Sequence, residues 1–478
     1  MSATRTVDVA ILGAGTAGLT ARRTAKKAGA SVLMIDPGPF GTTCARVGCM
    51  PSKLLIAAAD AAHHARDAGP FGVHADVTVD GPAVLKRVQS ERDRFVGFVV
   101  KAIEEAEADG ELLRERARIT GPGTLQAGEV TVHYGSLVIA TGTAPFVPPP
   151  YRDVPAEVLL TNEHIFELED LPESLLVVGL GVIGLELGQA FHRLGVRTTL
   201  LGIGGGVGPL SDPAVLATAH QVFGESLDLH ADHELRSVHV LPDGQGVEVH
   251  FVDSHGVERT ETFERVLMAA GRRTSLPWLG LETLGLENGR SWPVDPTTLQ
   301  LADLPVFVAG DANELHPLLH EAADDGRIAG ANAARFPDVR AQTRRTSLGI
   351  VFSDPQMAVV GRSYRSLDDC EAAVGSVDYS DQGRSRVQRI NKGLVRIYAS
   401  SADARIIGAE LFGPRVEHLA HLLAWAVQSG MTVDQALQMP FYHPVVEEGI
   451  RTALRDLAVN LRRGDRIKCR VSELGVGS

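Results

Sequence analysis

The stretch Val7-Asp-Val-Ala-Ile-Leu-Gly-Ala-Gly-Thr-Ala-Gly18 decides the fold, because an apolar run ends there in a glycine-rich turn. The apolar run has the length of a buried parallel strand. Residues 16–29 after the turn predict a helix, and the apolar residues 31–36 predict a second strand. Strand, turn, helix and strand in this order predict a βαβ unit.

The turn of this unit has the residues of a dinucleotide-binding site. Gly13, Gly15 and Gly18 allow tight bending and close approach of the backbone to a pyrophosphate at the helix N-terminus. Asp36 ends the second strand, where an acid can hold the adenosine ribose. A purely structural turn is the alternative, but strand, helix and acid together favour nucleotide binding.

The same pattern returns in Leu175-Leu-Val-Val-Gly-Leu-Gly-Val-Ile-Gly184, followed by a predicted helix to Leu194 and a strand over residues 197–201. This internal repeat predicts a second dinucleotide site. Its turn glycines are Gly179, Gly181 and Gly184. The position that corresponds to Asp36 is Gly202, so the acid that binds the 2′-hydroxyl of NAD is missing. No arginine follows closely to receive a 2′-phosphate, and the choice between NAD and NADP stays open.

Two cysteines, Cys44 and Cys49, lie in Gly41-Thr-Thr-Cys-Ala-Arg-Val-Gly-Cys-Met-Pro-Ser-Lys53, about one mononucleotide-binding unit after the first turn. With four cysteines in the chain, a secreted disulfide scaffold is excluded. A close cysteine pair in a reducing compartment indicates catalysis or metal binding. Metal binding is the less favoured of the two, because no second cysteine or histidine pair has matching spacing. We therefore predict no metal site, and expect electrons to move between a disulfide and the dinucleotide. Cys370 and Cys469 look like bystanders.

Length and charge restrict the class of protein. A chain of 478 residues is too long for one core, so several domains are expected. The net charge of −13 argues against a nucleic-acid partner. No apolar run is long enough to predict a membrane span, and the N-terminus leaves no room for a signal peptide. The expected compartment is the cytosol.

Two charged pairs further along the chain are candidates for the chemistry. Lys53 and Glu186 are both expected to face the interior, where each would neutralise the other. In Tyr442-His-Pro-Val-Val-Glu-Glu448, which we expect to begin a helix, Glu448 is positioned to orient the ring of His443 as a general base. The simpler alternatives are an exposed Glu186 and a surface histidine.

The remaining segments predict the domain organisation. Residues 144–150 are too rich in proline for a regular element and predict a linker. Short strands and helices after about residue 345 predict an α+β tail. We expect the following boundaries: 1–150, first part of a dinucleotide-binding domain; 151–271, second dinucleotide-binding domain; 272–344, return to the first; 345–478, C-terminal domain.

Taken together, these residues resemble the flavin-dependent pyridine-nucleotide disulfide oxidoreductases over nearly the whole length, and within them the dihydrolipoamide dehydrogenases. The resemblance is carried by the first turn with Asp36, Thr43–Lys53, Ala140-Thr-Gly142, Gly179–Glu186, Ala309-Gly-Asp311 and His443–Glu448. It implies an α/β fold with two Rossmann-like domains, for FAD and NAD(P), and a C-terminal α+β dimerisation domain. Cofactor-binding roles are implied for Gly13, Gly15, Gly18, Asp36, Lys53, Thr141, Gly142, Gly179, Gly181, Gly184, Glu186, Gly271 and Asp311.

The resemblance also implies individual roles. Cys49 would be the flavin-proximal, charge-transfer thiol, and Cys44 would exchange with substrate. Lys53, paired with Glu186, would lie near flavin N5. Asp311 would contact the ribitol. In a homodimer, His443 would complete the site of the opposite subunit.

The implied reaction is oxidation of protein-bound dihydrolipoamide by NAD⁺. The alternatives are an NAD(P)H-dependent reductase of another disulfide, similar to glutathione reductase, and a non-catalytic flavoprotein subunit or redox sensor. Mercuric reductase is a less favoured alternative than glutathione reductase, because a terminal vicinal cysteine pair is absent. Three departures from the family pattern are Val182 in place of a tyrosine that shields the flavin, Phe441-Tyr442 in place of His-Ala, and Thr42 in place of a glycine.

Overall fold

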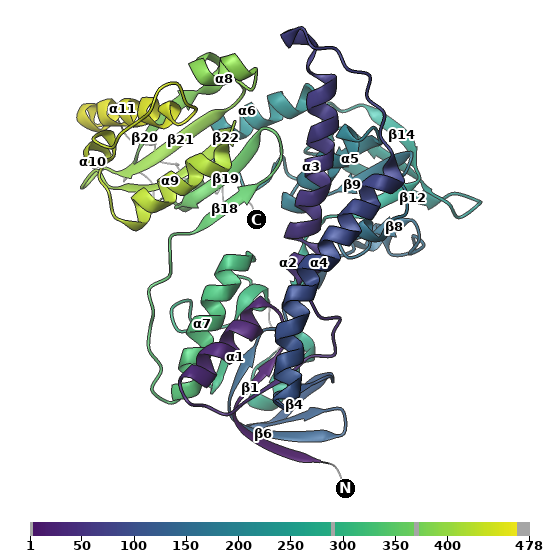
Figure 1. The fold of residues 1–478 in the computed structure, drawn as a ribbon, viewed down its shortest axis with the longest axis vertical. Helices are drawn as coiled ribbons and strands as arrows, with labels where there is room; N and C mark the ends of the chain where they lie inside the picture. The colour runs from purple at the N-terminus through teal and green to yellow at the C-terminus, as the bar shows by residue number, and fades with distance from the viewer. Residues whose placement is uncertain (1–2, 288–291, 368–371, 466–478) are drawn as a thin grey trace, which may run out of the picture.

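The computed structural model describes residues 3–287, 292–367 and 372–465. Figure 1 shows three lobes: a seven-stranded sheet with its helices at the bottom, a parallel five-stranded sheet at the right, and an antiparallel five-stranded sheet at the upper left. Two long helices run from the lower lobe to the right-hand one. Cys370 and Cys469 lie outside the described residues.

The lower lobe is built around the first βαβ unit. Its strands are β1 (Thr4–Leu12), β2 (Val32–Ile35), β3 (Leu112–Leu113), β4 (Ala117–Gly121), β5 (Thr124–Ala127), β6 (Val130–Ile139) and β17 (Val306–Val308). Their order is β3-β2-β1-β6-β5-β4, with β17 beside β6. Because β17 pairs in parallel with β6, a late segment of the chain returns to complete the first sheet.

Helices α1 (Thr16–Lys27) and α7 (Leu319–Arg335) pack against each other on this sheet. Small residues allow the close approach: a Cβ on Gly326 would lie 2.2 Å from the Ala17 carbonyl oxygen, and one on Gly330 would lie 2.5 Å from that of Ala21. A larger side chain at either glycine would push the helices apart. The glycines therefore hold the returning segment against the first βαβ unit.

Helices α2 (Thr43–Val47), α3 (Cys49–Arg66) and α4 (Gly81–Ala108) carry the redox motif away from this sheet. Helix α3 packs against both α4 and α5 (Val182–Arg193). Buried apolar side chains join the three helices in one cluster that includes Leu55, Val88 and Phe191. This cluster connects the cysteine motif to the second dinucleotide-binding unit.

The right-hand lobe contains the second βαβ unit. Its parallel strands, in sheet order, are β11 (Asp228–His230), β10 (Arg197–Leu201), β9 (Ser174–Val178), β15 (Arg265–Met268) and β8 (Leu159–Leu160). Helix α6 (Pro213–Gly224) follows β10 along the chain. A separate antiparallel sheet consists of β12 (Glu234–Val240), β13 (Val247–Val252) and β14 (Glu258–Phe263).

The prediction that residues 144–150 have no regular structure is wrong at both ends of the segment, because a 3-10 helix (Pro149–Tyr151) follows a short strand. Thr143–Pro145 forms strand β7, which pairs antiparallel with β16 (Arg272–Thr274). In a two-stranded ribbon each strand bonds on one side only, so a terminal proline is tolerated. The two connections between the lower and right-hand lobes are thereby held together.

The C-terminal lobe is an antiparallel α+β unit. Its strands, in sheet order, are β18 (Leu348–Val351), β19 (Gln356–Gly361), β22 (Ile406–Gly413), β21 (Leu394–Ser400) and β20 (Ala372–Asp378). Its helices are α8 (Gly383–Gln388), α9 (Val416–Gln428), α10 (Val433–Leu437) and α11 (Glu448–Arg463). The helix that we expect over residues 445–461 is present as α11, but it begins at Glu448 and not at Val445.

The predicted fold class is confirmed: two parallel-sheet units and an antiparallel C-terminal unit. The domain boundaries stay predictions. Among the described residues, no helix combines the length and apolar character that a membrane span requires.

Candidate redox active site

Cys44 and Cys49 are brought together by the break between two helices. Cys44 lies in the short helix α2, Gly48 ends it, and Cys49 is the first residue of α3. Both are free cysteines, and their side chains form a hydrogen bond. A Cβ on Gly48 would lie 2.9 Å from the Thr43 carbonyl oxygen, so a glycine is needed where the chain turns between the thiols.

The two thiols are chemically different. The hydrogen bond from Cys44, together with the positive charge of Lys53, lowers the pKa of Cys49 to about 7 although burial opposes the shift. The same hydrogen bond and burial raise the pKa of Cys44. Cys49 is therefore the thiol that carries negative charge near neutral pH, while Cys44 stays protonated.

Lys53 and Glu186 form a partly buried ion pair beside the cysteines. The Lys53 ammonium lies 2.8 and 2.7 Å from the two Glu186 carboxylate oxygens, and Glu186 is only 4% exposed. Glu186 also accepts the Phe352 backbone N–H at 3.0 Å and the Ser52 hydroxyl at 3.3 Å. The ammonium lies 4.5 Å from the centre of the Phe352 ring. One carboxylate thus joins α3, α5 and the residue after β18.

Two residues of the motif stand out in the structure although the sequence did not single them out for a role. Thr42 caps α2 by accepting the Ala45 N–H at 3.3 Å, and its φ of +60° lies in the region that favours glycine. The replacement of a glycine by Thr42 is thus accompanied by a new helix cap. Arg46 lies between the cysteines, and its buried Nε has no hydrogen-bond partner within the part of the chain that the structure describes.

The first glycine turn leaves room for a ligand and none for larger side chains. A Cβ on Gly13 would lie 2.3 Å from the Ala140 carbonyl oxygen, and one on Gly18 only 1.9 Å from that of Gly13. Over Gly15, no atom lies within 4 Å of the Cβ position. Asp36 accepts the Ala14 N–H at 2.6 Å, so its carboxylate lies against the turn.

The second glycine turn has the same geometry. A Cβ on Gly179 would lie 2.3 Å from the Ala269 carbonyl oxygen, one on Gly184 would lie 1.9 Å from that of Gly179, and the space over Gly181 is open. Val182, the first residue of α5, is 39% exposed at this opening. The sequence repeat is therefore a repeat of two equivalent cradles, each at a helix N-terminus.

Four residues with an implied cofactor-binding role lie just beyond strand ends: Thr141 and Gly142 after β6, Asp311 after β17, and Gly271 after β15. Burial raises the pKa of Asp311, and the nearby Arg272 opposes this shift. The Thr141 hydroxyl accepts a hydrogen bond of 2.9 Å from Ser275. Gly142 and Gly271 have φ values of +64° and +105°, which favour glycine.

Sequence reasoning missed a polar bridge between these segments and the cysteine motif. The Asn162 side chain donates to the Val47 carbonyl at 2.8 Å, and Arg272 donates to Asn162 at 2.9 Å. Arg272 also donates to the Thr143 carbonyl at 2.7 Å, and burial lowers its pKa. A lone Asn after a loop and an Arg after a glycine carry no recognisable sequence signal.

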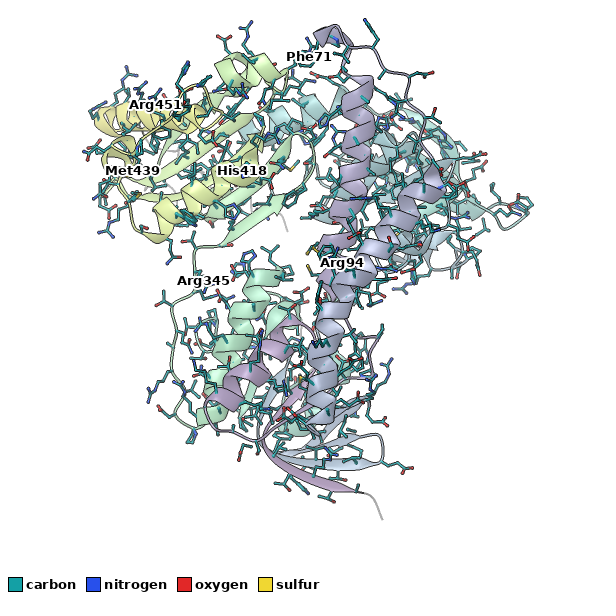
Figure 2. The ribbon with its side chains drawn as sticks, in the orientation of Figure 1. Phe71, Arg94, Arg345, His418, Met439 and Arg451 are labelled. Carbon is teal, nitrogen blue, oxygen red and sulfur yellow. The ribbon has the colours of Figure 1, made fainter. Side chains whose placement is uncertain are left out.

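His443 and Glu448 form a pair on the C-terminal lobe. Nδ1 of His443 lies 3.0 Å from the Glu448 carboxylate, which also receives the Arg451 guanidinium at 3.0 Å. The His443 side chain is 80% exposed. No contact described for this chain joins it to either cysteine. Figure 2 shows Arg451 at the outer edge of this lobe, away from the long helices.

An apolar groove of about 390 Å³ lies next to this pair. Its lining includes Leu422, Met439, Phe441, Tyr442 and Ile450. Met439 and Tyr442 are exposed large side chains, and Figure 2 shows Met439 at the outer edge of the lobe. In the described part of the chain, no cluster of three or more His, Cys, Asp or Glu side chains is arranged to hold a metal ion.

Comparison with known families supplies the context for this geometry. The family model "Pyridine nucleotide-disulphide oxidoreductase" matches residues 7–329, and the model of the dimerisation domain of the same family matches residues 348–454. The chain belongs to this family. The predicted recognition is confirmed, and the second match supports a homodimer.

Curated relatives of two kinds are similar to the chain. Dihydrolipoyl dehydrogenase of Halobacterium salinarum is 28% identical over 93% of this chain and 95% of its own length. Mercuric reductase of Streptomyces lividans is 31% identical over 91% of this chain and 93% of its own length. The chain is therefore a flavoprotein disulfide oxidoreductase with Cys44–Cys49 as its redox pair, of a family that uses FAD and NAD(P).

Solved structures agree with this assignment. LpdA of Mycobacterium tuberculosis has a TM-score of 0.78 and 26% identity, covering 94% of this chain and 99% of that one. The HOCl-induced flavoprotein disulfide reductase RclA of Escherichia coli has a TM-score of 0.76 at 21% identity over 94% of this chain and 99% of that one, which supports the fold alone.

Proposed function

We propose that this protein oxidises the dihydrolipoyl group of a carrier protein and delivers the electron pair to NAD⁺. The observation that carries the proposal is the contact between Cys44 and Cys49 at the start of α3, with Lys53 close enough to stabilise a thiolate on Cys49. A vicinal dithiol is the substrate class that reduces a protein disulfide by one intermolecular attack, which gives a mixed disulfide, and one intramolecular attack of its second thiol.

The first half of the reaction is thiol–disulfide exchange at Cys44. One substrate thiol loses its proton to His443 and attacks the Cys44 sulfur, so the Cys44–Cys49 bond breaks and Cys49 leaves as a thiolate. The second substrate thiol then attacks the substrate sulfur of the mixed disulfide and releases Cys44, and the proton that this second thiol loses passes to the leaving Cys44 thiolate. The substrate loses two electrons, and the cysteine pair gains them.

The residues present fit the two cofactors of the family. The cradle of Gly13, Gly15 and Gly18, with Asp36 against it, would hold the FAD pyrophosphate and ribose, and Asp311 would contact the ribitol. The second cradle would hold the pyridine nucleotide. When bound, FAD carries the electron pair from the cysteine couple to NAD⁺. The ammonium of Lys53, fixed by Glu186, would lie beside the flavin and favour its anionic electron-rich form.

The base would come from a second copy of the chain. His443 is exposed, makes no contact with the cysteines of its own chain among the described residues, and is hydrogen-bonded to Glu448. The adjacent apolar groove offers a surface for subunit association. We propose a homodimer in which His443 of the partner subunit faces Cys44.

A substrate panel tests the proposal. The holoenzyme is assayed with dihydrolipoamide and NAD⁺, and in the reductive direction with lipoamide, glutathione disulfide and Hg²⁺, each with NADH and NADPH. Turnover of dihydrolipoamide that is lost in Cys44→Ser and kept in Cys370→Ser is expected. Turnover of glutathione disulfide or Hg²⁺ without any of dihydrolipoamide would replace the proposed substrate, and Hg²⁺ is included because a mercuric reductase is among the relatives.

A further inference from the structure

The position after β10, where a ribose-binding acid is expected, is too crowded for a side chain. Gly202 follows β10 directly, and a Cβ there would lie 2.7 Å from Leu180 Cδ1 and 3.0 Å from the Ala231 carbonyl oxygen. Leu180 belongs to the second glycine turn, between Gly179 and Gly181. A side chain at residue 202 would therefore displace the residue that shapes the pyrophosphate cradle.

Another carboxylate reaches the same place from the neighbouring strand. Asp232 lies two residues beyond the end of β11, and its Oδ1 accepts the Gly204 N–H at 2.9 Å. Asp232 is exposed, and its second carboxylate oxygen has no partner within the described residues. The acid thus stands over the loop that begins at Gly202.

Backbone hydrogen bonds hold the two strand ends together. Gly202 donates to the His230 carbonyl at 2.8 Å, and Gly205 donates to the Ala231 carbonyl at 3.1 Å. The His233 ring and its backbone N–H lie 2.6 and 3.2 Å from the Gly202 carbonyl. The position of Asp232 relative to the glycine loop is therefore fixed by the hydrogen bonds of its neighbours His230, Ala231 and His233, and not by its own side chain alone.

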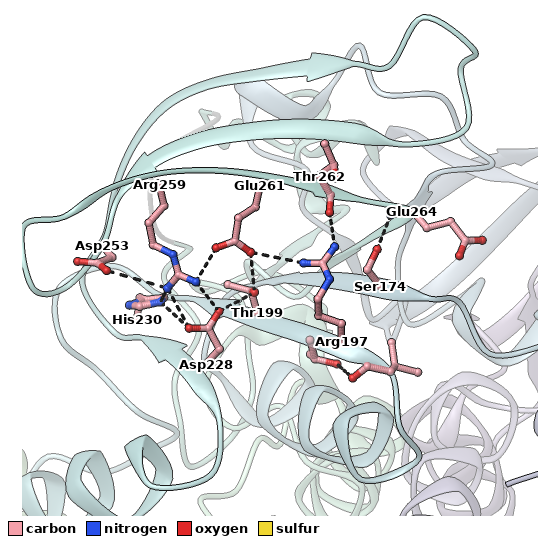
Figure 3. A network of polar contacts seen from close by, with 12 residues as sticks. Ser174, Arg197, Thr199, Asp228, His230, Asp253, Arg259, Glu261, Thr262 and Glu264 are labelled. Carbon is pink, nitrogen blue, oxygen red and sulfur yellow. Dashed lines mark hydrogen bonds and ion pairs between the residues drawn. The ribbon is translucent and has the colours of Figure 1, made fainter. Parts of the chain in front are cut away.

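No free cation faces this loop from the adjacent segments. Residues 202–208 and 228–235 contain neither Lys nor Arg, and Arg236 is paired with Glu234. The Arg259 guanidinium is engaged by Asp228 at 2.9 Å and by Glu261 at 2.5 Å, as Figure 3 shows. A 2′-phosphate would therefore meet a carboxylate and no unpaired guanidinium.

We infer that Asp232 takes the place of the missing ribose-binding acid and makes the second cradle select the nucleotide without a 2′-phosphate. A carboxylate accepts hydrogen bonds from the ribose hydroxyls, whereas a 2′-phosphate with a charge of about −1.5 to −2 is repelled. This inference rests on the proposed function only in that a pyridine nucleotide occupies the second cradle. It assigns the selection to a residue that follows β11 rather than to one that follows β10.

Direct binding separates this inference from the reaction itself. Isothermal titration of the holoenzyme with ADP-ribose and with 2′-phospho-ADP-ribose reports the second cradle without turnover. The variants are Asp232→Asn, which keeps an oxygen for the Gly204 N–H and removes the charge, and Asp232→Lys. Asp243→Asn is the matched control, because Asp243 is an exposed acid that caps a backbone N–H at 2.9 Å in the same lobe.

The wild type is expected to bind ADP-ribose at least about tenfold more tightly than the 2′-phospho ligand, the value of one charge-assisted hydrogen bond. Asp232→Asn should weaken ADP-ribose about tenfold, Asp232→Lys should reverse the preference, and Asp243→Asn should change neither. Equal binding of both ligands to the wild type, or an unchanged preference in both Asp232 variants, would overturn the inference. If dihydrolipoamide is not a substrate, the proposed function fails while this binding preference still stands.

Discussion

Removal of the Cys44 thiol tests which interaction makes Cys49 acidic. The hydrogen bond from Cys44 is the largest cause that lowers the pKa of Cys49 from the ordinary thiol value of 9.0 to about 7. In Cys44→Ala this donor is gone, whereas burial, which raises the pKa, and Lys53, which lowers it, both stay. The pKa of Cys49 should therefore return to about 9. Cys44→Ser keeps a hydroxyl donor and should lie between the two.

The magnitude follows from the size of the shift. A difference of about two pKa units corresponds to at most about 2.7 kcal/mol in the free energy of thiolate formation, because Cys49 is exposed and solvent screens its interactions. At pH 7 the thiolate fraction of Cys49 should fall from about one half to about one in a hundred in Cys44→Ala. Stabilisation of the thiolate is fully present above the ordinary pKa and is lost as pH falls through about 7 in the wild type.

The assay is the pH dependence of alkylation by iodoacetamide, followed on the Cys49 peptide by mass spectrometry. This readout excludes Cys370 and Cys469, which would also react in the whole protein. The reasoning is wrong if Cys44→Ala and Cys44→Ser share a midpoint near pH 7. In that event Lys53 alone, and not the neighbouring thiol, would account for the acidity.

The structure sets the direction of the effect for substitutions at three further residues. Lys53→Met should lower the free energy of unfolding by about 2 kcal/mol or more in urea titration, because Glu186 loses its cation while buried, and Lys53→Arg should restore part of it. Glu410→Ala should cost about 3 kcal/mol in the same assay, because the Tyr364 N–H and two other backbone donors lose a fully buried acceptor; unchanged stability would contradict this. Gly18→Ala should yield colourless protein with a near-native circular dichroism spectrum, since a Cβ cannot fit 1.9 Å from a carbonyl oxygen of the cradle; retained flavin absorbance would refute that reasoning.

Local patterns were sufficient to predict the two βαβ units. Glycine spacing, apolar runs and strand ends determine the cradles from within about thirty consecutive residues. The pairing of Lys53 with Glu186 was also accessible, because two charges on buried helix faces require each other. The meeting of His443 with Glu448 could be expected for a different reason, because the two residues lie only five positions apart in the sequence.

What the sequence did not show depends on contacts between distant segments. The β7–β16 ribbon and the bridge of Asn162 with Arg272 form only when both connections between lobes lie side by side. In the sequence, Gly202 in place of an acid indicates only that the usual ribose-binding carboxylate is absent. Only the packing of Leu180 and the register of β11 show why that position is closed and which acid lies beside it.

The triple junction at Glu186 restricts how this chain can be recombined. Its carboxylate receives an ammonium from one structural unit and a backbone amide from another, and it belongs to a third. A chimera that exchanges the C-terminal part at residue 345 would have to place a backbone N–H where that of Phe352 now lies. Otherwise the buried Glu186 carboxylate would lose one of its donors. Crossover points that carry Phe352 along with α5 keep this donor, whereas those that separate the two should give hybrids of lower stability.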